Sequence, residues 1–401
     1  MAGRLERDAN DGEPRVTFGG DAFEVARLGF KLGCTAFGGP AVHVAMLRDE
    51  AVVRRCWLTD SHFTELLGMT NLLPGPNSTE MVMHIGFKRA GWRGLLAAGV
   101  GFITPAAIVS LALAWGYVRF GATPSGTGFL NGVKPVAIAV IGWAVWSLGK
   151  STVHGVAGLL LTGCVSLLHV LGVHELILLV FGALTWAGWS AFRRMAFDRG
   201  GTALGIILPW LLVPFGVPLA LAPRGEEPTA LRLFLVFLKI GATLYGSGYV
   251  LVAYLRSDLV ERTSWLTEQQ LLDAIAIGQI TPGPLLSAAT FAGYLAGGWT
   301  GAIAATVGIF LPAFLLVGFA SSLLPRLRRI SWVAPIVDGL GLAAIGLMAA
   351  VLVPLGRAAL TDNWRLALAV LAFLLLVRFR VNAAILIAGG GLLGLLVTAL
   401  A

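Results

Sequence analysis

The chain consists of apolar runs of membrane-spanning length separated by short polar segments. A helix needs about 20 apolar residues to cross the hydrocarbon core of a bilayer, and several runs here reach that length. We therefore expect an all-α polytopic membrane protein with about 10–13 transmembrane spans, in which the shorter runs are candidates for half-membrane hairpins. The predicted spans are 22–46, 61–87, 94–118, 129–149, 153–171, 173–191, 202–222, 230–254, 268–296, 299–323, 333–356, 364–378 and 381–400.

The sequence contains an internal repeat. Residues Lys31 to Pro76 align without a gap onto Lys239 to Pro284 at a constant offset of 208, with identical residues at 17 of the 46 positions. A duplication in an apolar chain is typical of secondary transporters whose site lies between the two halves. We predict four segments, namely a polar N-terminal tail (1–21), a first repeat (22–200), a linker span with its loop (201–229) and a second repeat (230–401).

Composition supports the membrane assignment and excludes a nucleic-acid-binding protein. The chain is 57% hydrophobic and 12% charged, with a mean hydropathy of +0.83, whereas soluble domains carry about 25% charged residues. The net charge of +8 comes from Lys and Arg clusters between apolar runs, the pattern of cytoplasmic loops. The tail contains no apolar core of a cleavable signal, and we expect the N-terminus to be cytoplasmic.

Equivalent loops of the two halves carry opposite charge patterns. The loop after the second span is basic in the first half, with Lys88, Arg89 and Arg93, and uncharged in the second half. The next loop is basic in the second half, within 326–329, and nearly uncharged in the first. Under the positive-inside rule, equivalent loops then lie on opposite sides of the membrane, which favours inverted repeats over a parallel tandem duplication.

Both repeats contain a Pro-Gly-Pro triplet inside an apolar run. Proline lacks a backbone donor and clashes with the preceding turn, so a helix breaks there. The half-helix after such a break presents unpaired N–H groups and a partial positive charge, which suits an oxyanion; the alternative is a proline kink that serves packing alone. The predicted substrate-binding residues at the breaks are Pro74, Gly75, Pro76, Asn77, Ser78 and Thr79, with Thr281, Pro282, Gly283, Pro284 and Ser287 in the second half.

A lysine lies inside the first span of each repeat. Lys31 and its equivalent Lys239 lie about eight residues inside their runs, where a charge normally faces a cavity or a partner. Beside two half-helix N-termini they would form a positively charged pocket; the alternative is snorkelling of each lysine to the interface. The glycine-rich ends of these spans allow close approach or a second break, and the residues assigned to the site there are Gly38, Gly39, Gly246 and Ser247.

Two carboxylates at equivalent positions are the candidates for proton coupling. Glu65 and Asp273 each precede the first proline of their triplet by nine residues. Thr267 and Gln270 resemble a capping box, so both acids could instead lie in a first helical turn near the interface. Glu80, His43 and His84 have no counterpart in the second half, and we expect them to be satisfied by local contacts.

Three motifs together resemble the chromate ion transporter family in its long, duplicated form. They are Phe30-Lys-Leu-Gly followed by Ala36-Phe-Gly-Gly-Pro40, then Glu50-x3-Arg54-x2-Trp57-Leu58, and Leu73-Pro-Gly-Pro-Asn-Ser-Thr79. The second half departs from the pattern where Gly39-Pro40 becomes Ser247-Gly248 and Asn77-Ser78 becomes Leu285-Leu286. Carried over by position, the structural or gating candidates are Arg48, Glu50, Arg54 and Trp57, with Arg256, Asp258, Arg262 and Trp265 in the second half.

The resemblance implies a carrier in the bacterial cytoplasmic (inner) membrane. Its substrate would be chromate, and export driven by a proton gradient or the membrane potential would confer chromate resistance. Sulfate would compete as a second tetrahedral dianion.

The residues alone indicate an anion-selective secondary transporter, because no Walker A motif is present. Uptake or exchange of sulfate and a passive anion channel are the alternatives. Scattered histidines and three cysteines without CxxC spacing disfavour a reductase, so we expect no enzymatic activity, cofactor or metal; a homodimer is one assembly we consider.

Overall fold

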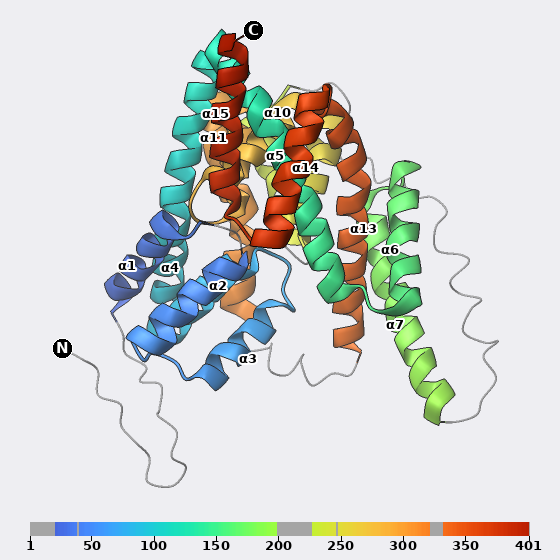
Figure 1. Cartoon of the computed structure of the whole chain (residues 1–401). Helices are drawn as coiled ribbons and strands as arrows, with labels where there is room; N and C mark the ends of the chain where they lie inside the picture. The colour runs from blue at the N-terminus through green and yellow to red at the C-terminus, as the bar shows by residue number, and fades with distance from the viewer. Residues whose placement is uncertain (1–20, 38–39, 199–226, 246–247, 321–331, 401) are drawn as a thin grey trace.

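A computed structural model of the chain describes residues 21–37, 40–198, 227–245, 248–320 and 332–400, and every regular element in these ranges is a helix (Figure 1). Six of the described helices are long and apolar enough to cross a membrane. The first repeat comprises α1 (Ala22–Thr35), α2 (Pro40–Arg48), η1 (Asp49–Arg54), α3 (Asp60–Thr70), α4 (Asn77–Phe120), α5 (Pro124–Thr152), α6 (Gly155–Val170) and α7 (Glu175–Asp198). The second comprises α8 (Ala230–Thr243), η4 (Gly248–Val250), α9 (Leu251–Leu255), η5 (Arg256–Arg262), α10 (Glu268–Ile280), η6 (Leu285–Ser287), α11 (Ala288–Ala320), α13 (Val333–Ala359), α14 (Asn363–Phe379) and α15 (Ala383–Leu400).

The repeat seen in the sequence extends to the backbone geometry. α4 is kinked at Gly91, where φ is 58°, and α11 is kinked at Gly298, where φ is 61°. Each glycine follows a residue with φ of −141°, and each kink is followed by a proline inside the helix, Pro105 in α4 and Pro312 in α11. A positive φ costs a residue with a side chain more than it costs glycine, so both copies place glycine there. The turn expected between spans 61–87 and 94–118 is present there, because a Cβ added at Gly86 would collide with the carbonyl oxygen of Gly94, so the chain folds back on itself at Gly91.

Two expected spans are interrupted. The run 22–46 is divided between α1, which ends at Thr35, and α2, which begins at Pro40. Proline suits the first position of a helix, because the N–H that it lacks would have no partner there. In the second repeat, the run 230–254 is divided in the same way, since α8 ends at Thr243 and η4 begins at Gly248.

The two repeats exchange their last two helices. α5 of the first repeat packs against α14 and α15 of the second, while α13 packs against α6 and α7 of the first. Glycines make the closest approaches, because a side chain at Gly132 would collide with the backbone of Gly390, and one at Gly339 would collide with the backbone of Gly182. These two contacts are equivalent under the repeat, so the exchange is reciprocal.

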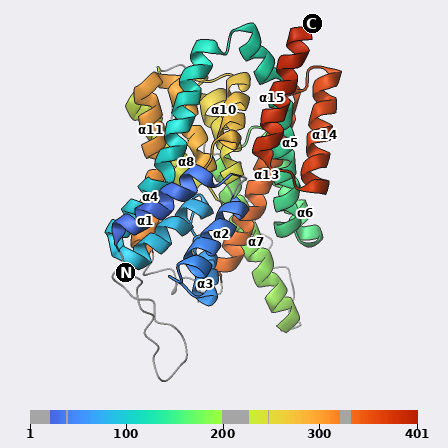
Figure 2. The ribbon, with the colours of Figure 1, turned by 60° about the vertical axis from the view of Figure 1, so that its left-hand side comes forward.

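The centre of the molecule is formed by the longest helices of the two repeats. α4 packs on α1, α11 packs on α8, and α4 and α11 pack on each other. Figures 1 and 2 show α1, α2 and α3 at one end of the body and the C-terminal end of α15 at the other, with α5 and α13 running in opposite directions between these ends.

Candidate functional site

Both Pro-Gly-Pro triplets break the helix that they interrupt. α3 ends at Thr70 and α4 begins at Asn77, while α10 ends at Ile280 and η6 begins at Leu285. The central glycines take positive φ angles, 146° at Gly75 and 90° at Gly283, which redirect the chain. The expected helix breaks are thus present in both repeats, each with a new helix directly after it.

Each break is hydrogen-bonded to the end of the first helix of the other repeat. The N–H of Gly75 donates to the carbonyl oxygen of Leu244 at 2.7 Å, and the N–H of Gly283 donates to the carbonyl oxygen of Ala36 at 2.9 Å. Leu244 and Ala36 are the C-cap residues of α8 and α1, whose last carbonyls have no partner within the helix. Backbone hydrogen bonds thus join the two breaks and the two helix ends into one centre between the repeats.

Two hydroxyl groups at equivalent positions in this centre are buried and unsatisfied. Thr79 and Ser287 are both fully buried, and neither side-chain oxygen has a hydrogen-bond partner in the structure. The residue before each new helix is a proline, Pro76 or Pro284, which offers no side-chain cap. Buried hydroxyls and uncapped N–H groups are donors that a bound oxyanion could use.

The two predicted site lysines are each paired with a carboxylate. The Nζ atom of Lys31 lies 2.5 Å from Glu50, and that of Lys239 lies 2.5 Å from Asp258 and 3.4 Å from Glu175. Glu50 and Asp258 are equivalent residues of the π-helices η1 and η5, so the pairing is part of the repeat. The sequence did not indicate this pairing; in this conformation the lysines bind protein carboxylates.

The two ion pairs differ in their electrostatics. Burial alone would raise the pKa of Glu50, but hydrogen bonds and charges from Lys31 and Arg55 outweigh it and hold that pKa below its ordinary value. At Asp258, burial has the larger effect, and together with the neighbouring Glu175 it raises the pKa despite Lys239. The first pair is more open, since 47% of the Lys31 side chain is exposed against 20% for Lys239.

The structural or gating candidates surround these ion pairs. Trp57 is buried, and the guanidinium carbons of Arg55 and Arg89 each lie 4.9 Å from its ring centroid. Arg54 and Arg262 lie 3.6 Å from Glu50 and 3.1 Å from Asp258, respectively. Arg48, the last residue of α2, pairs with Asp60 of α3 at 2.6 Å, and Arg256, the first residue of η5, pairs with Glu268 of α10 at 2.7 Å. Trp265 is partly buried.

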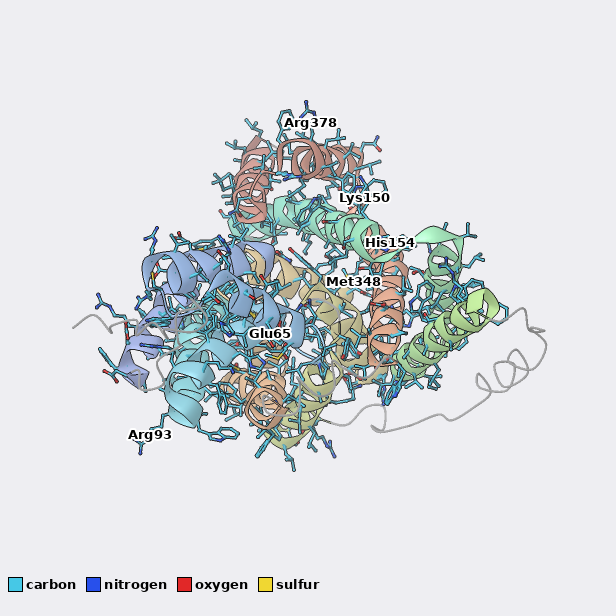
Figure 3. All side chains as sticks on the ribbon, turned by 90° about the horizontal axis from the view of Figure 1, so that it is seen from below. Glu65, Arg93, Lys150, His154, Met348 and Arg378 are labelled. Atoms are coloured by element: carbon cyan, nitrogen blue, oxygen red, sulfur yellow. The ribbon has the colours of Figure 1, made fainter. Side chains whose placement is uncertain are left out.

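The two coupling candidates occupy different environments. Asp273 is 1% exposed, accepts a hydrogen bond from the Tyr117 hydroxyl at 2.9 Å and lies 3.5 Å from Lys134. Its equivalent Glu65 is exposed on α3, near the centre of the end of the molecule seen in Figure 3. The capping box formed by Thr267 and Gln270 is confirmed at the start of α10, yet Asp273 is buried, so the cap does not place this acid at an exposed surface.

Four predicted site residues, Gly38, Gly39, Gly246 and Ser247, lie outside the described residues, as do the predicted linker span 202–222 and the basic segment 326–329. Within the described residues, no group of three His, Cys, Asp or Glu side chains could hold a metal ion.

The comparison with known families agrees with this architecture of two copies. The sequence model of the chromate transporter family matches residues 23–189 and 231–395, one match in each repeat. The chain belongs to the chromate transporter family. It is accordingly a multi-pass membrane transporter and not an enzyme.

Similar proteins cover nearly the whole length of this transporter. A chromate transport protein of Pseudomonas aeruginosa is 32% identical over 386 residues, covering 92% of this chain and 90% of the relative. A chromate transport protein of Cupriavidus metallidurans is 28% identical over 370 residues, covering 91% and 90%. An uncharacterised transporter of Methanocaldococcus jannaschii is 25% identical over 356 residues, covering 86% and 87%. No solved structure matches the transporter.

The structure overturns the expectation that Glu80 and His84 are satisfied locally. Both are buried in the first turns of α4, and neither oxygen of Glu80 nor the Nε2 atom of His84 has a hydrogen-bond partner. His43 does find a partner, since its Nε2 atom lies 3.0 Å from the carbonyl oxygen of Ala36, the same oxygen that accepts from Gly283. The signal available in the sequence was that Glu80 is an acid in an apolar run directly after a helix break, where charge is normally functional.

Proposed function

We propose that the transporter is a secondary carrier that exports chromate across the bacterial cytoplasmic membrane and so confers chromate resistance. The names of the similar proteins support chromate as the substrate. Sulfate, which shares the tetrahedral shape and the double charge, competes with it. The proton gradient or the membrane potential drives transport, because the sequence carries no Walker A motif for ATP.

The proposed binding site lies at the starts of the two half-helices. The observation that carries it is the pair of equivalent, buried and unpartnered hydroxyls of Thr79 and Ser287, each next to a helix break. A tetrahedral oxyanion could accept hydrogen bonds from both hydroxyls and from the free N–H groups of the first turns. The two halves contribute unequally, since the first adds the polar Asn77 and Ser78 where the second has leucines.

In this proposal Lys31 and Lys239 do not contact the oxyanion directly in the described conformation. Each now holds a π-helix through Glu50 or Asp258. Release of a lysine from its carboxylate would add positive charge for the oxyanion.

We also propose that the two repeats, residues 22–200 and 230–401, are inverted relative to each other in the membrane. Residues 201–229 would link them, the chain would cross the membrane 10–13 times, and its N-terminus would lie in the cytoplasm. Support comes from α4 and α11, whose contacts bring Gly99 near Phe314 and Trp92 near Gly318, so these equivalent helices pack antiparallel. Equivalent spanning helices that pack antiparallel are related by an axis in the membrane plane. The opposite directions of α5 and α13 agree with this arrangement (Figure 2).

Flux of radiolabelled chromate in inverted membrane vesicles tests the function. Energy-dependent accumulation that excess sulfate inhibits is the expected result, and Thr79→Ala combined with Ser287→Ala should remove most of it. Ser151→Ala, which removes an exposed hydroxyl from α5, is the matched control and should transport normally. Accumulation only in right-side-out vesicles would establish uptake instead, and flux that dissipates gradients without accumulation would establish a channel.

A further inference from the structure

The first turn of α4 contains a carboxyl group with no partner. Glu80 is 0% exposed, and neither of its side-chain oxygens has a hydrogen-bond partner. The group is turned back toward the helix break, because a Cβ atom built on Gly75 would collide with its Oε1 atom. Its backbone N–H donates to the carbonyl oxygen of Pro76 at 3.1 Å, which fixes Glu80 at the start of the half-helix, directly after Thr79.

Among the described residues, no cation forms an ion pair with Glu80. Lys31 on α1 is bound to Glu50, Arg48 on α2 to Asp60, and Lys134 on α5 to Asp273.

Other titratable groups lie on the elements around Glu80 and on α4 itself. Tyr245, after α8, interacts electrostatically with Glu80 but donates its hydroxyl to the carbonyl oxygen of Leu72. His43 on α2 is bonded to Ala36. His84 lies one turn further along α4, and Lys88 follows it by another turn.

An ionised carboxylate cannot share this position with an oxyanion. Burying a charge without a partner is very costly, so the protonated carboxyl is the form that fits this conformation. If Glu80 were ionised, its negative charge would lie beside Thr79, at the place proposed for the oxyanion, and the two like charges would repel each other. The second repeat has Ala288 at the equivalent position, so each chain carries one such group.

We propose that Glu80 is the proton-binding residue of the transport cycle: it holds a proton while the oxyanion is bound at the start of α4 and releases that proton on the side where the oxyanion leaves. This inference rests on the proposed function. One proton then moves with each dianion in the same direction, and the cycle transfers one net negative charge. Export is therefore driven by the inside-negative membrane potential, and an inward proton gradient opposes it.

Proton uptake on binding tests the inference without transport. In the purified full-length protein in weakly buffered detergent solution, brought to a pH at which Glu80 of the empty carrier is ionised, adding chromate or sulfate should remove about one proton from solution per anion bound, reported by a pH indicator; at lower pH, where Glu80 already holds its proton, the uptake should vanish. Glu80→Gln should bind the anion with no proton uptake. Glu227→Gln, which changes an exposed carboxyl before α8, is the control and should behave like the wild type.

Transport in proteoliposomes gives the second readout. With the membrane potential clamped at zero, a gradient of about one pH unit, acidic on the chromate side, should give about tenfold accumulation of chromate, because one coupled proton balances one anion. Glu80→Gln should still exchange chromate for chromate but should not respond to the gradient. Glu80→Asp keeps a carboxyl group and should retain the response, which covers the case that the Gln variant does not fold.

The outcomes separate the two proposals. If neither chromate nor sulfate binds the wild type, the proposed function fails and the role of Glu80 fails with it. If the anion binds without proton uptake at every pH tested, or if accumulation occurs when the chromate side is alkaline, the carrier stands and the Glu80 proposal is overturned. A Glu80→Gln variant that still responds to the pH gradient overturns it as well.

Discussion

Gly283 donates its backbone N–H to the carbonyl oxygen of Ala36 at 2.9 Å, so the helix break of the second repeat is attached to the end of the first helix of the chain. Gly75 makes the equivalent bond to Leu244 at 2.7 Å. A change at either break is therefore transmitted to the other repeat, and the centre can be tested from both sides.

Replacing the central glycines should inactivate the transporter. Gly75→Ala and Gly283→Ala place a side chain at φ angles of 146° and 90°, and the added Cβ meets Glu80 in the first case and lies 3.1 Å from the carbonyl oxygen of Gly33 in the second. We expect each to lose about 1–3 kcal/mol of stability and most of its chromate flux. Gly149→Ala, where the Cβ enters open space in α5, should be near neutral in flux and thermal unfolding.

The two lysines should differ in their importance for stability. Lys239→Ala leaves Glu175 without its lysine and Asp258 with Arg262 alone, and it should cost about 2–3 kcal/mol, somewhat below the usual range for a broken buried pair because Lys239 is partly exposed and Arg262 remains. Lys31→Ala should cost under about 1 kcal/mol, since the Lys31 side chain is half exposed and Arg55 also faces Glu50.

Thermal unfolding in detergent separates the two variants, and flux assays report function. Lys31→Ala is expected to be expressed normally and to lose transport. Normal flux in that variant would contradict any role of Lys31 in the transport cycle.

The helix exchange predicts sensitivity at glycines far from the site. Gly132→Leu and Gly339→Leu should separate α5 from α15 and α13 from α7, because a side chain at either position collides with the opposing backbone. We expect several kcal/mol of destabilisation and loss of the monodisperse peak in size-exclusion chromatography. Gly356→Leu in α13, which has open space around it, is the control; equal damage at all three positions would argue against the exchange.

A cross-link between α4 and the second helix break should stop transport. The hydroxyl oxygens of Ser110 and Thr281 are 3.4 Å apart, so these side chains of the two repeats are in direct contact. In a background lacking Cys34, Cys56 and Cys164, the Ser110→Cys and Thr281→Cys pair should cross-link under oxidation. We expect flux to fall on oxidation and to recover on reduction, whereas each single substitution should be insensitive to oxidant.

Sequence patterns predicted the parts of the structure that depend on local chemistry. Proline and glycine determine where the helices break, so both triplets and the capping box at Thr267 could be located without coordinates. The pairing of Lys31 with Glu50 could not, because it depends on a π-helix 19 residues away, whose register the apolar pattern does not encode. The isolation of Glu80 was missed for a related reason: whether a polar group is satisfied depends on every helix packed around it.

The exchange of helices also constrains how the chain is assembled as it is synthesised. α5 is made early, but the surfaces of α14 and α15 that cover it are the last to emerge from the ribosome. Conversely, α6 and α7 enter the membrane long before α13 exists. Until then, lipid contacts the surfaces of the first repeat that α13, α14 and α15 later cover, and the packing of α5 is complete only once α15 has inserted.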